Sequence, residues 1–88
     1  MKEAAGRYFA DLFDLPPEVI LDVPRVILVG NLHLTVENHR GIIEYSPTKV
    51  VIGVGEGQVE VTGEGLTISH VYRHEVAVVG RVAGVRTT

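Results

Sequence analysis

The sequence predicts a mainly β fold: an antiparallel meander of about eight short strands, folded into a small sandwich or a partly open barrel. Three observations support this prediction. The chain is rich in valine and isoleucine, which favour strands over helices. Glycine-containing segments separate the apolar runs at intervals of roughly 8–10 residues, as turns do in an antiparallel sheet. Within several runs apolar and polar residues alternate, which indicates strands with one solvated face. A short β-solenoid is the alternative, and residues 1–88 are expected to form a single domain.

One amphipathic α-helix is predicted over residues 2–15. Its apolar residues recur at helical spacing and are Ala4, Ala5, Tyr8, Phe9, Leu12 and Phe13. Prolines 16 and 17 end the helix, because proline disfavours helix in the preceding residue and has no amide to donate. The large members of the stripe form the candidate interaction face: Tyr8, Phe9, Leu12 and Phe13. This face packs on the protein's own sheet, on a partner or second copy, or on a membrane surface. The membrane is disfavoured because the polar face of the helix lacks basic residues.

The β region is predicted over residues 25–86 and is organised around a hairpin at residues 30–46. Leu32, Leu34 and Val36 alternate with polar residues in its first strand. Turn-forming residues follow at 38–41, and Ile42–Tyr45 is expected to return alongside the first strand. The preceding strand, Arg25–Val29, is apolar on both faces, so we expect it to be covered on both sides.

The later strands are predicted to be short β-branched runs: Val50–Val54, Gln58–Thr62, Leu66–Val71, Val76–Val79 and Arg81–Arg86. The segments between them are expected to be turns: Gly55–Gly57, Gly63–Gly65, Arg73–Glu75 and Gly80. Alternation within the strands places Leu34 and Ile68 among the core residues.

Composition excludes several classes of function. There is no cysteine, so disulfides and thiolate metal sites are absent. The net charge is −3 and the charges are interspersed, which does not suit nucleic-acid binding. No secretory signal pattern opens the chain, and its apolar runs are much shorter than a bilayer span. We therefore expect a soluble protein that is not transmembrane and has no nucleic-acid partner.

The histidines do not predict a metal site. His70 and His74 are four residues apart, the spacing of zinc ligands on a helix, but they are expected at a strand end and in the next turn. Together with His33 and His39 they are interpreted as scattered surface histidines, because metal coordination needs three or four converging ligands.

Other polar groups give no stronger signal. Glu37, His39 and Glu44 flank the predicted hairpin, but no pocket is predicted around them. The glycine-rich segment Gly53–Gly57 precedes a strand instead of a helix, so it indicates a hairpin turn and not a phosphate-binding loop. We therefore predict no catalytic, cofactor-binding or metal-ligating residues.

Several segments together resemble a known family. Leu15–Val26 (LPPEVILDVPRV), followed by Gly30–Leu32 and Val36–Ile42 (VENHRGI), is similar to the YabP/YqfC family of endospore-forming bacteria, and closest to its YqfC branch. Later segments that fit the same pattern are Gly63–Ile68 and Val78–Val82. The chain departs from the pattern at Val85–Thr88, where family members often have an aromatic residue.

The resemblance implies a sporulation role in the mother-cell cytoplasm or at the periphery of the forespore membrane, without known enzymatic activity or ligand residues. By association, it also implies a membrane-associated sporulation protein as partner. Our leading hypothesis is a non-enzymatic assembly or scaffolding protein that binds itself, as a homo-oligomer, or such a partner. The alternative is a small-molecule or glycan-binding module with a pocket lined by Tyr45 or Tyr72. An enzyme that uses Glu37 and His39 ranks third.

Overall fold

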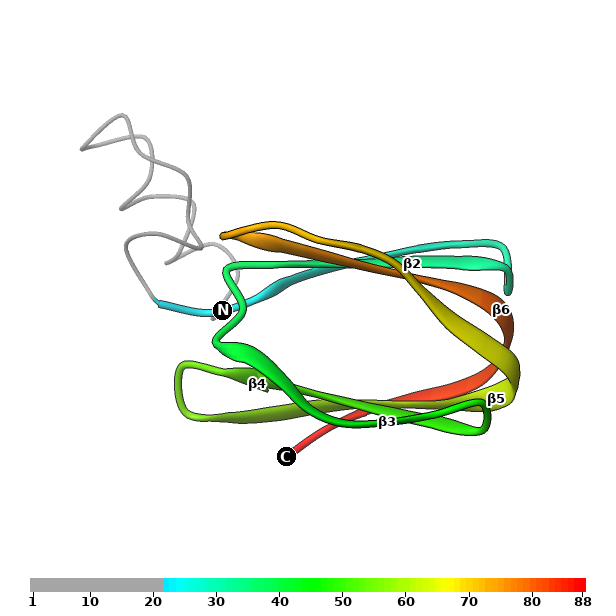
Figure 1. The fold of residues 1–88 in the computed structure, drawn as a ribbon. Helices are drawn as coiled ribbons and strands as arrows, with labels where there is room; N and C mark the ends of the chain where they lie inside the picture. The colour runs from blue at the N-terminus through cyan, green and yellow to red at the C-terminus, as the bar shows by residue number, and fades with distance from the viewer. Residues whose placement is uncertain (1–21) are drawn as a thin grey trace, which may run out of the picture.

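The computed structural model describes residues 22–88, which form one antiparallel sheet (Figure 1). The strands are β1 (Arg25–Val29), β2 (His33–Glu37), β3 (Gly41–Ser46), β4 (Lys49–Val54), β5 (Gly57–Val71) and β6 (Glu75–Thr87). Their order is β1-β2-β6-β5-β4-β3, and every neighbouring pair is antiparallel. The predicted mainly β antiparallel fold is confirmed, with six strands instead of about eight. The helix predicted at residues 2–15 lies outside the described residues.

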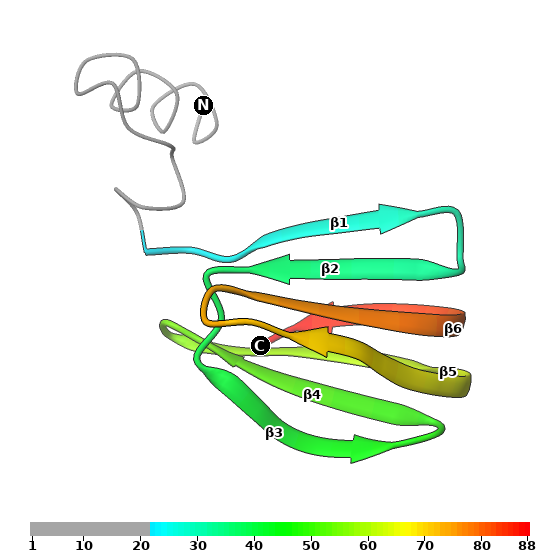
Figure 2. The same cartoon turned by 45° about the horizontal axis from the view of Figure 1, so that its top comes forward.

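The sheet folds into two layers because β5 and β6 are long and bent (Figure 1). The first half of β5 pairs with β4 and with the end of β6, whereas its second half pairs with the start of β6. The start of β6 also pairs with β2. The first layer therefore contains β1, β2, the start of β6 and the end of β5. The second layer contains β3, β4, the start of β5 and the end of β6. The sheet does not close, because within residues 22–88 its outer strands β1 and β3 each pair on one side only (Figure 2).

Glycines allow the bend at two positions where the sequence predicted turns. β5 runs through Gly63–Gly65, and β6 runs through Gly80, without reversing direction. A Cβ on Gly63 would overlap the carbonyl oxygen of Arg81 in the paired strand. Gly80 has a φ of 135°, and a Cβ there would lie 2.6 Å from the carbonyl oxygen of Gly65. The strands thus approach more closely than side chains permit. The turns predicted at Gly63–Gly65 and Gly80 are wrong for this reason, and each position joins two predicted strands into one.

The hairpin predicted at residues 30–46 is wrong, although both of its strands exist. β2 pairs with β1 and β6, whereas β3 pairs with β4 in the other layer. Residues 38–40 cross between the layers (Figure 2). The amide of Asn38 donates to the carbonyl of His74 at 2.7 Å, and the amide of Arg40 donates to the carbonyl of Gly53 at 2.6 Å. Because the crossover obtains hydrogen bonds from both layers, its backbone needs no hairpin partner.

Two other predicted turns are confirmed. Residues 55 and 56 connect β4 to β5, and residues 72–74 connect β5 to β6. Both connections join strands that are adjacent and antiparallel in the sheet. These are the hairpins in which local sequence and strand pairing agree.

Ten buried aliphatic side chains pack together as the core: Leu34, Val36, Val50, Ile52, Val59, Val61, Leu66, Val76, Val78 and Val82. They come from both layers and from both halves of β5 and β6. Leu34 is fully buried as predicted, and Ile68 is partly buried against the same cluster. The predicted alternation of inward and outward residues is therefore confirmed in these strands.

The first strand is less covered than predicted. We expected both faces of Arg25–Val29 to be buried, but Leu28 is 45% exposed and Val29 is 62% exposed. The reason is that β1 is an outer strand of the sheet. The apolar residues on both faces of β1 therefore belong to an outer strand and not to a central one.

Candidate functional site

Three of the four histidines lie near Tyr72, just after the end of β5. His39 Nε2 lies 2.8 Å from the carbonyl oxygen of Tyr72. The ring of His70 stacks on that of Tyr72, with centroids 4.4 Å apart, and His70 Nε2 lies 2.7 Å from Glu75 Oε2. His74 follows in the same turn, so the interpretation of scattered histidines is incomplete. Within residues 22–88, however, no group of three His, Asp or Glu side chains is placed to hold a metal ion.

The hydrogen bonds of His39 give it a structural role. Its Nδ1 accepts from the amide of Gly41 at 2.9 Å, so the ring proton belongs on Nε2. Nε2 can then donate to the carbonyl of Tyr72. The imidazole thereby joins the crossover to the connection between β5 and β6, which fixes the chain as it passes from the first layer to the second. Both ring nitrogens are occupied by backbone groups.

Glu37, His39 and Glu44 do not form an acid–base set. Glu37 lies 3.9 Å from Arg25 in the neighbouring strand β1. Glu44 belongs to the other layer and lies 3.9 Å from Lys49. Since each group has a different neighbour, their arrangement offers no shared position for a substrate.

The crossover is also tied to the segment that precedes β1. Arg40 Nη2 lies 2.7 Å from Asp22 Oδ1, although both side chains are about half exposed. Asn38 Nδ2 donates to the carbonyl of Val23 at 3.0 Å, and Asn38 has a φ of 61°, a left-handed conformation that asparagine tolerates. The two stretches with the most specific family resemblance therefore meet here. Nothing in their local sequence patterns predicted that Asp22 and Arg40 form an ion pair.

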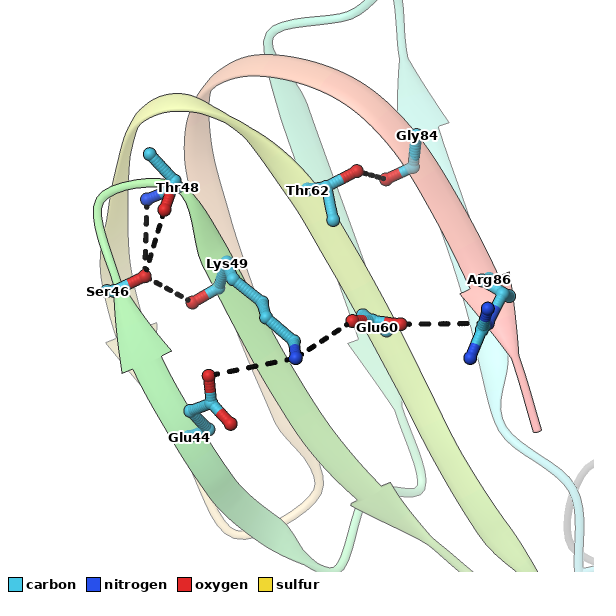
Figure 3. Close-up of polar contacts among 8 residues, drawn as sticks. All are labelled: Glu44, Ser46, Thr48, Lys49, Glu60, Thr62, Gly84 and Arg86. Atoms are coloured by element: carbon cyan, nitrogen blue, oxygen red, sulfur yellow. Dashed lines mark hydrogen bonds and ion pairs between the residues drawn. The ribbon is translucent and has the colours of Figure 1, made fainter.

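A row of alternating charges crosses the outer face of the second layer (Figure 3). Lys49 Nζ lies 3.1 Å from Glu60 and 3.9 Å from Glu44, while Arg86 Nε lies 3.6 Å from the other oxygen of Glu60. Val51 stands between Glu44 and Glu60 in the strand register and is only 3% exposed. Two positive and two negative groups balance one another, so the row favours sheet stability over ion binding.

A depression of about 380 Å³ opens beside the bend and is lined by Thr48, Thr62, Gly63, Glu64, Arg81 and Ala83. Neither tyrosine of the expected ligand pocket lines it. Tyr45 instead donates its hydroxyl to the carbonyl of Leu66 at 3.0 Å, and Tyr72 is 63% exposed. The side chains of Glu64 and Arg81 are 80% and 74% exposed. The depression is therefore open to water and differs from the pocket expected of a small-molecule or glycan-binding module.

Exposed apolar side chains gather around the end of β1. Leu28, Val29 and Leu32 are 45%, 62% and 63% exposed. β1 pairs with β2 over all five of its residues without a register shift, whereas the other outer strand, β3, has a bulge between Ile42 and Glu44. Within residues 22–88, β1 is a mainly apolar strand that is paired on one side only, and such an edge is the kind of surface to which another strand adds. This edge is the candidate functional surface of the described domain.

The interaction face predicted from the sequence, formed by Tyr8, Phe9, Leu12 and Phe13, lies outside the described residues and stays a prediction. Between residues 22 and 88, no helix has the length and hydropathy needed to cross a bilayer.

Comparison with known proteins identifies a matching family and a similar protein. The sequence pattern of the YabP family matches residues 22–87, a span that takes in all six strands, the bend and the crossover. The chain is also 34% identical over 73 residues to the uncharacterized protein YqfC of Bacillus subtilis (strain 168). That alignment covers 83% of this chain and 78% of the relative.

Proposed function

The chain belongs to the YabP/YqfC family, and on this premise we propose that it is a non-enzymatic sporulation protein that acts as an assembly or scaffolding module. In this proposal it works in the mother cell, in the cytoplasm or at the periphery of the forespore membrane. It binds a second copy of itself, a membrane-associated sporulation protein, or both.

The free edge of β1 is the observation that carries this proposal. It combines a regular strand, open on one side within the described residues, with the half-exposed or exposed side chains of Leu28, Val29 and Leu32. Exposed apolar surface of this kind is typical of binding regions.

A genetic experiment tests the non-enzymatic part. The gene is deleted in the sporulating bacterium that encodes it, and spore yield is measured after complementation with the parent, Glu37→Gln or His39→Asn. We expect both variants to restore spores to the parental level when immunoblots show equal protein. Loss of spores by either variant, at equal protein level and with a melting temperature equal to that of the parent, would contradict the proposal, because the structural role of the replaced group would then be intact.

A second experiment tests assembly. The full chain is tagged, crosslinked in sporulating cells and purified from the membrane and soluble fractions. We expect either a second, differently tagged copy or a membrane protein to be recovered with it. Recovery of neither would contradict the assembly role.

A further inference from the structure

We propose that the chain forms a two-fold symmetric dimer in which β1 of one copy pairs antiparallel with β1 of a second copy, joining the two six-stranded sheets into one. This inference rests on the proposed assembly function and specifies its partner and its surface. The backbone, side chains and charge of β1 all suit this pairing, and the other edges of the described sheet suit it less.

In the described part of the chain, no strand pairs with the outer side of β1. The carbonyl of Val29 accepts from the amide of Leu32 in the connection to β2, so it faces β2. Since backbone groups alternate sides along an antiparallel strand, Ile27 also faces β2, whereas Val26 and Leu28 face the free edge. A pairing centred on Ile27 places Val26 opposite Leu28 of the second copy. Both residues then exchange backbone hydrogen bonds across the interface.

The same register suits the side chains. Val26 and Leu28 are paired with Val36 and Leu34, two core residues of β2, so all four point to the inner side of the first layer. Val26 packs against the core, but Leu28 is 45% exposed. In the dimer Leu28 packs beside Val26 of the second copy, so the apolar interior continues across the interface.

Charge favours antiparallel self-pairing over parallel pairing. Arg25 is the one charged residue of β1. In the antiparallel register the two copies of Arg25 lie at opposite ends of the interface, roughly 13 Å apart along the strands. A parallel pairing in register would place them side by side, where like charges repel.

The other edges of the described sheet are less suited to pairing. β3 has a bulge next to Glu44, and a bulge interrupts the regular array of backbone groups. The outer end of β5 has a register shift between Ile68 and His70, and the carbonyl of Leu66 is occupied by Tyr45. The outer end of β6 is flanked by Arg81 and Arg86, and charged edges discourage strand addition.

Cysteine crosslinking tests the register, because the chain has no native cysteine. At the centre of the proposed interface, the two Ile27 residues form a non-hydrogen-bonded pair with Cα atoms about 4.5 Å apart, within disulfide range. We expect full-length Ile27→Cys to oxidise to a covalent dimer in mild oxidant. Ile43→Cys, on the outer strand β3, is the control and is expected to stay largely monomeric. Equal crosslinking of the two variants would overturn the proposed interface.

Sedimentation equilibrium of full-length variants gives a second test without covalent capture. Val29 and Ile43 are each 62% exposed and lie on the two outer strands of the described sheet. Val29→Lys and Ile43→Lys therefore introduce the same charge at equally exposed positions on different edges. Lysine at position 29 places a charge on the proposed interface and should weaken dimerisation at least about tenfold, because charged edges discourage strand addition, whereas Ile43→Lys should dimerise like the parent. Circular dichroism melts verify that both variants fold.

The possible results of these tests distinguish failure of the β1 interface from failure of the proposed assembly function. A parent dimer that Val29→Lys leaves intact would overturn the β1 interface while self-assembly stands. A parent that is monomeric at all concentrations would overturn the dimer, including the case in which residues 1–21 cover β1. The assembly function would then depend on recovery of a membrane-associated partner from cells.

Discussion

Replacement of Gly80 by alanine should strongly destabilise the protein, because the bend requires a residue without a side chain there. Gly80 has a φ of 135°, which alanine adopts only with strain. Its added Cβ would lie 2.6 Å from the carbonyl oxygen of Gly65 and 2.9 Å from the Cα of Leu66. Both atoms belong to the backbone of β5. Relief of the overlap therefore requires the two longest strands to separate where they pass between the layers.

The cost can be worked out from two contributions. Backbone strain at a positive φ costs about 1–3 kcal/mol, and overpacking in a closely packed region costs about 1–3 kcal/mol. Together they predict a loss of about 2–6 kcal/mol. The total stability of a domain of this size is only about 4–10 kcal/mol, so the variant should be close to unfolding at 25 °C.

Urea denaturation followed by circular dichroism measures this effect, with Gly84→Ala as the matched control in the same strand. Gly84 does not have a positive φ, and its added Cβ would meet only the Thr62 hydroxyl at 3.3 Å. With a urea slope of about 1 kcal/mol/M, the midpoint of Gly80→Ala should fall by about 2 M or more, while Gly84→Ala should change it by less than about 1 M. Equal midpoints for the two variants would refute the close-approach explanation of the bend.

Three other predictions concern packing, charge and the crossover. Leu34→Ala should lower the free energy of unfolding by about 2–5 kcal/mol in urea melts, and Ile68→Ala by less, because Ile68 is only partly buried; equal losses would contradict the assigned core. Glu60→Gln should cost about 1 kcal/mol in low salt and less in 1 M salt, whereas Glu64→Gln, 80% exposed and 4.0 Å from its arginine, should cost almost nothing in either; a salt-independent loss at Glu60 would count against an ionic row. His39→Ala should cost about 1–3 kcal/mol and speed hydrogen exchange at the Gly41 amide; unchanged exchange there would contradict the assigned hydrogen bond.

Local sequence predicted strands well where alternation and burial agree. Arg25–Val29 was predicted to its ends, and inward-facing Leu34 lies in the core as expected. The glycine turn at residues 55–57 was also predicted, because it joins strands that are neighbours both in sequence and in the sheet. These features depend on side chains within a few residues of each other, which a periodic pattern records.

Pairing between distant strands was not predictable in the same way. Turn-forming residues after Glu37 show that the chain changes direction, but they do not show that β2 pairs with β6, some 40 residues later. Likewise, the two Gly-Glu-Gly triplets look alike, yet one is a turn and the other a bend. The difference lies in strand pairing, because the first triplet connects β4 to β5, whereas the second lies within β5 and pairs with β6.

The candidate surface shows the same limit. The sequence placed Val29 in a strand with both faces buried, whereas the structure leaves Val29 exposed. Only the strand order shows that β1 is an edge of the described sheet. The aromatic face of residues 8–13 stays a prediction from helical spacing alone. The edge proposed here for binding was therefore identified from the strand order, and the high content of valine and isoleucine was its only indication in the sequence.

Spore yield supported by Val29→Lys, compared with Ile43→Lys at equal protein level, tests most directly whether this chain acts through its β1 edge. We predict that Val29→Lys fails to restore sporulation to a deletion strain while Ile43→Lys restores it fully. Full restoration by both variants would contradict this role for the edge.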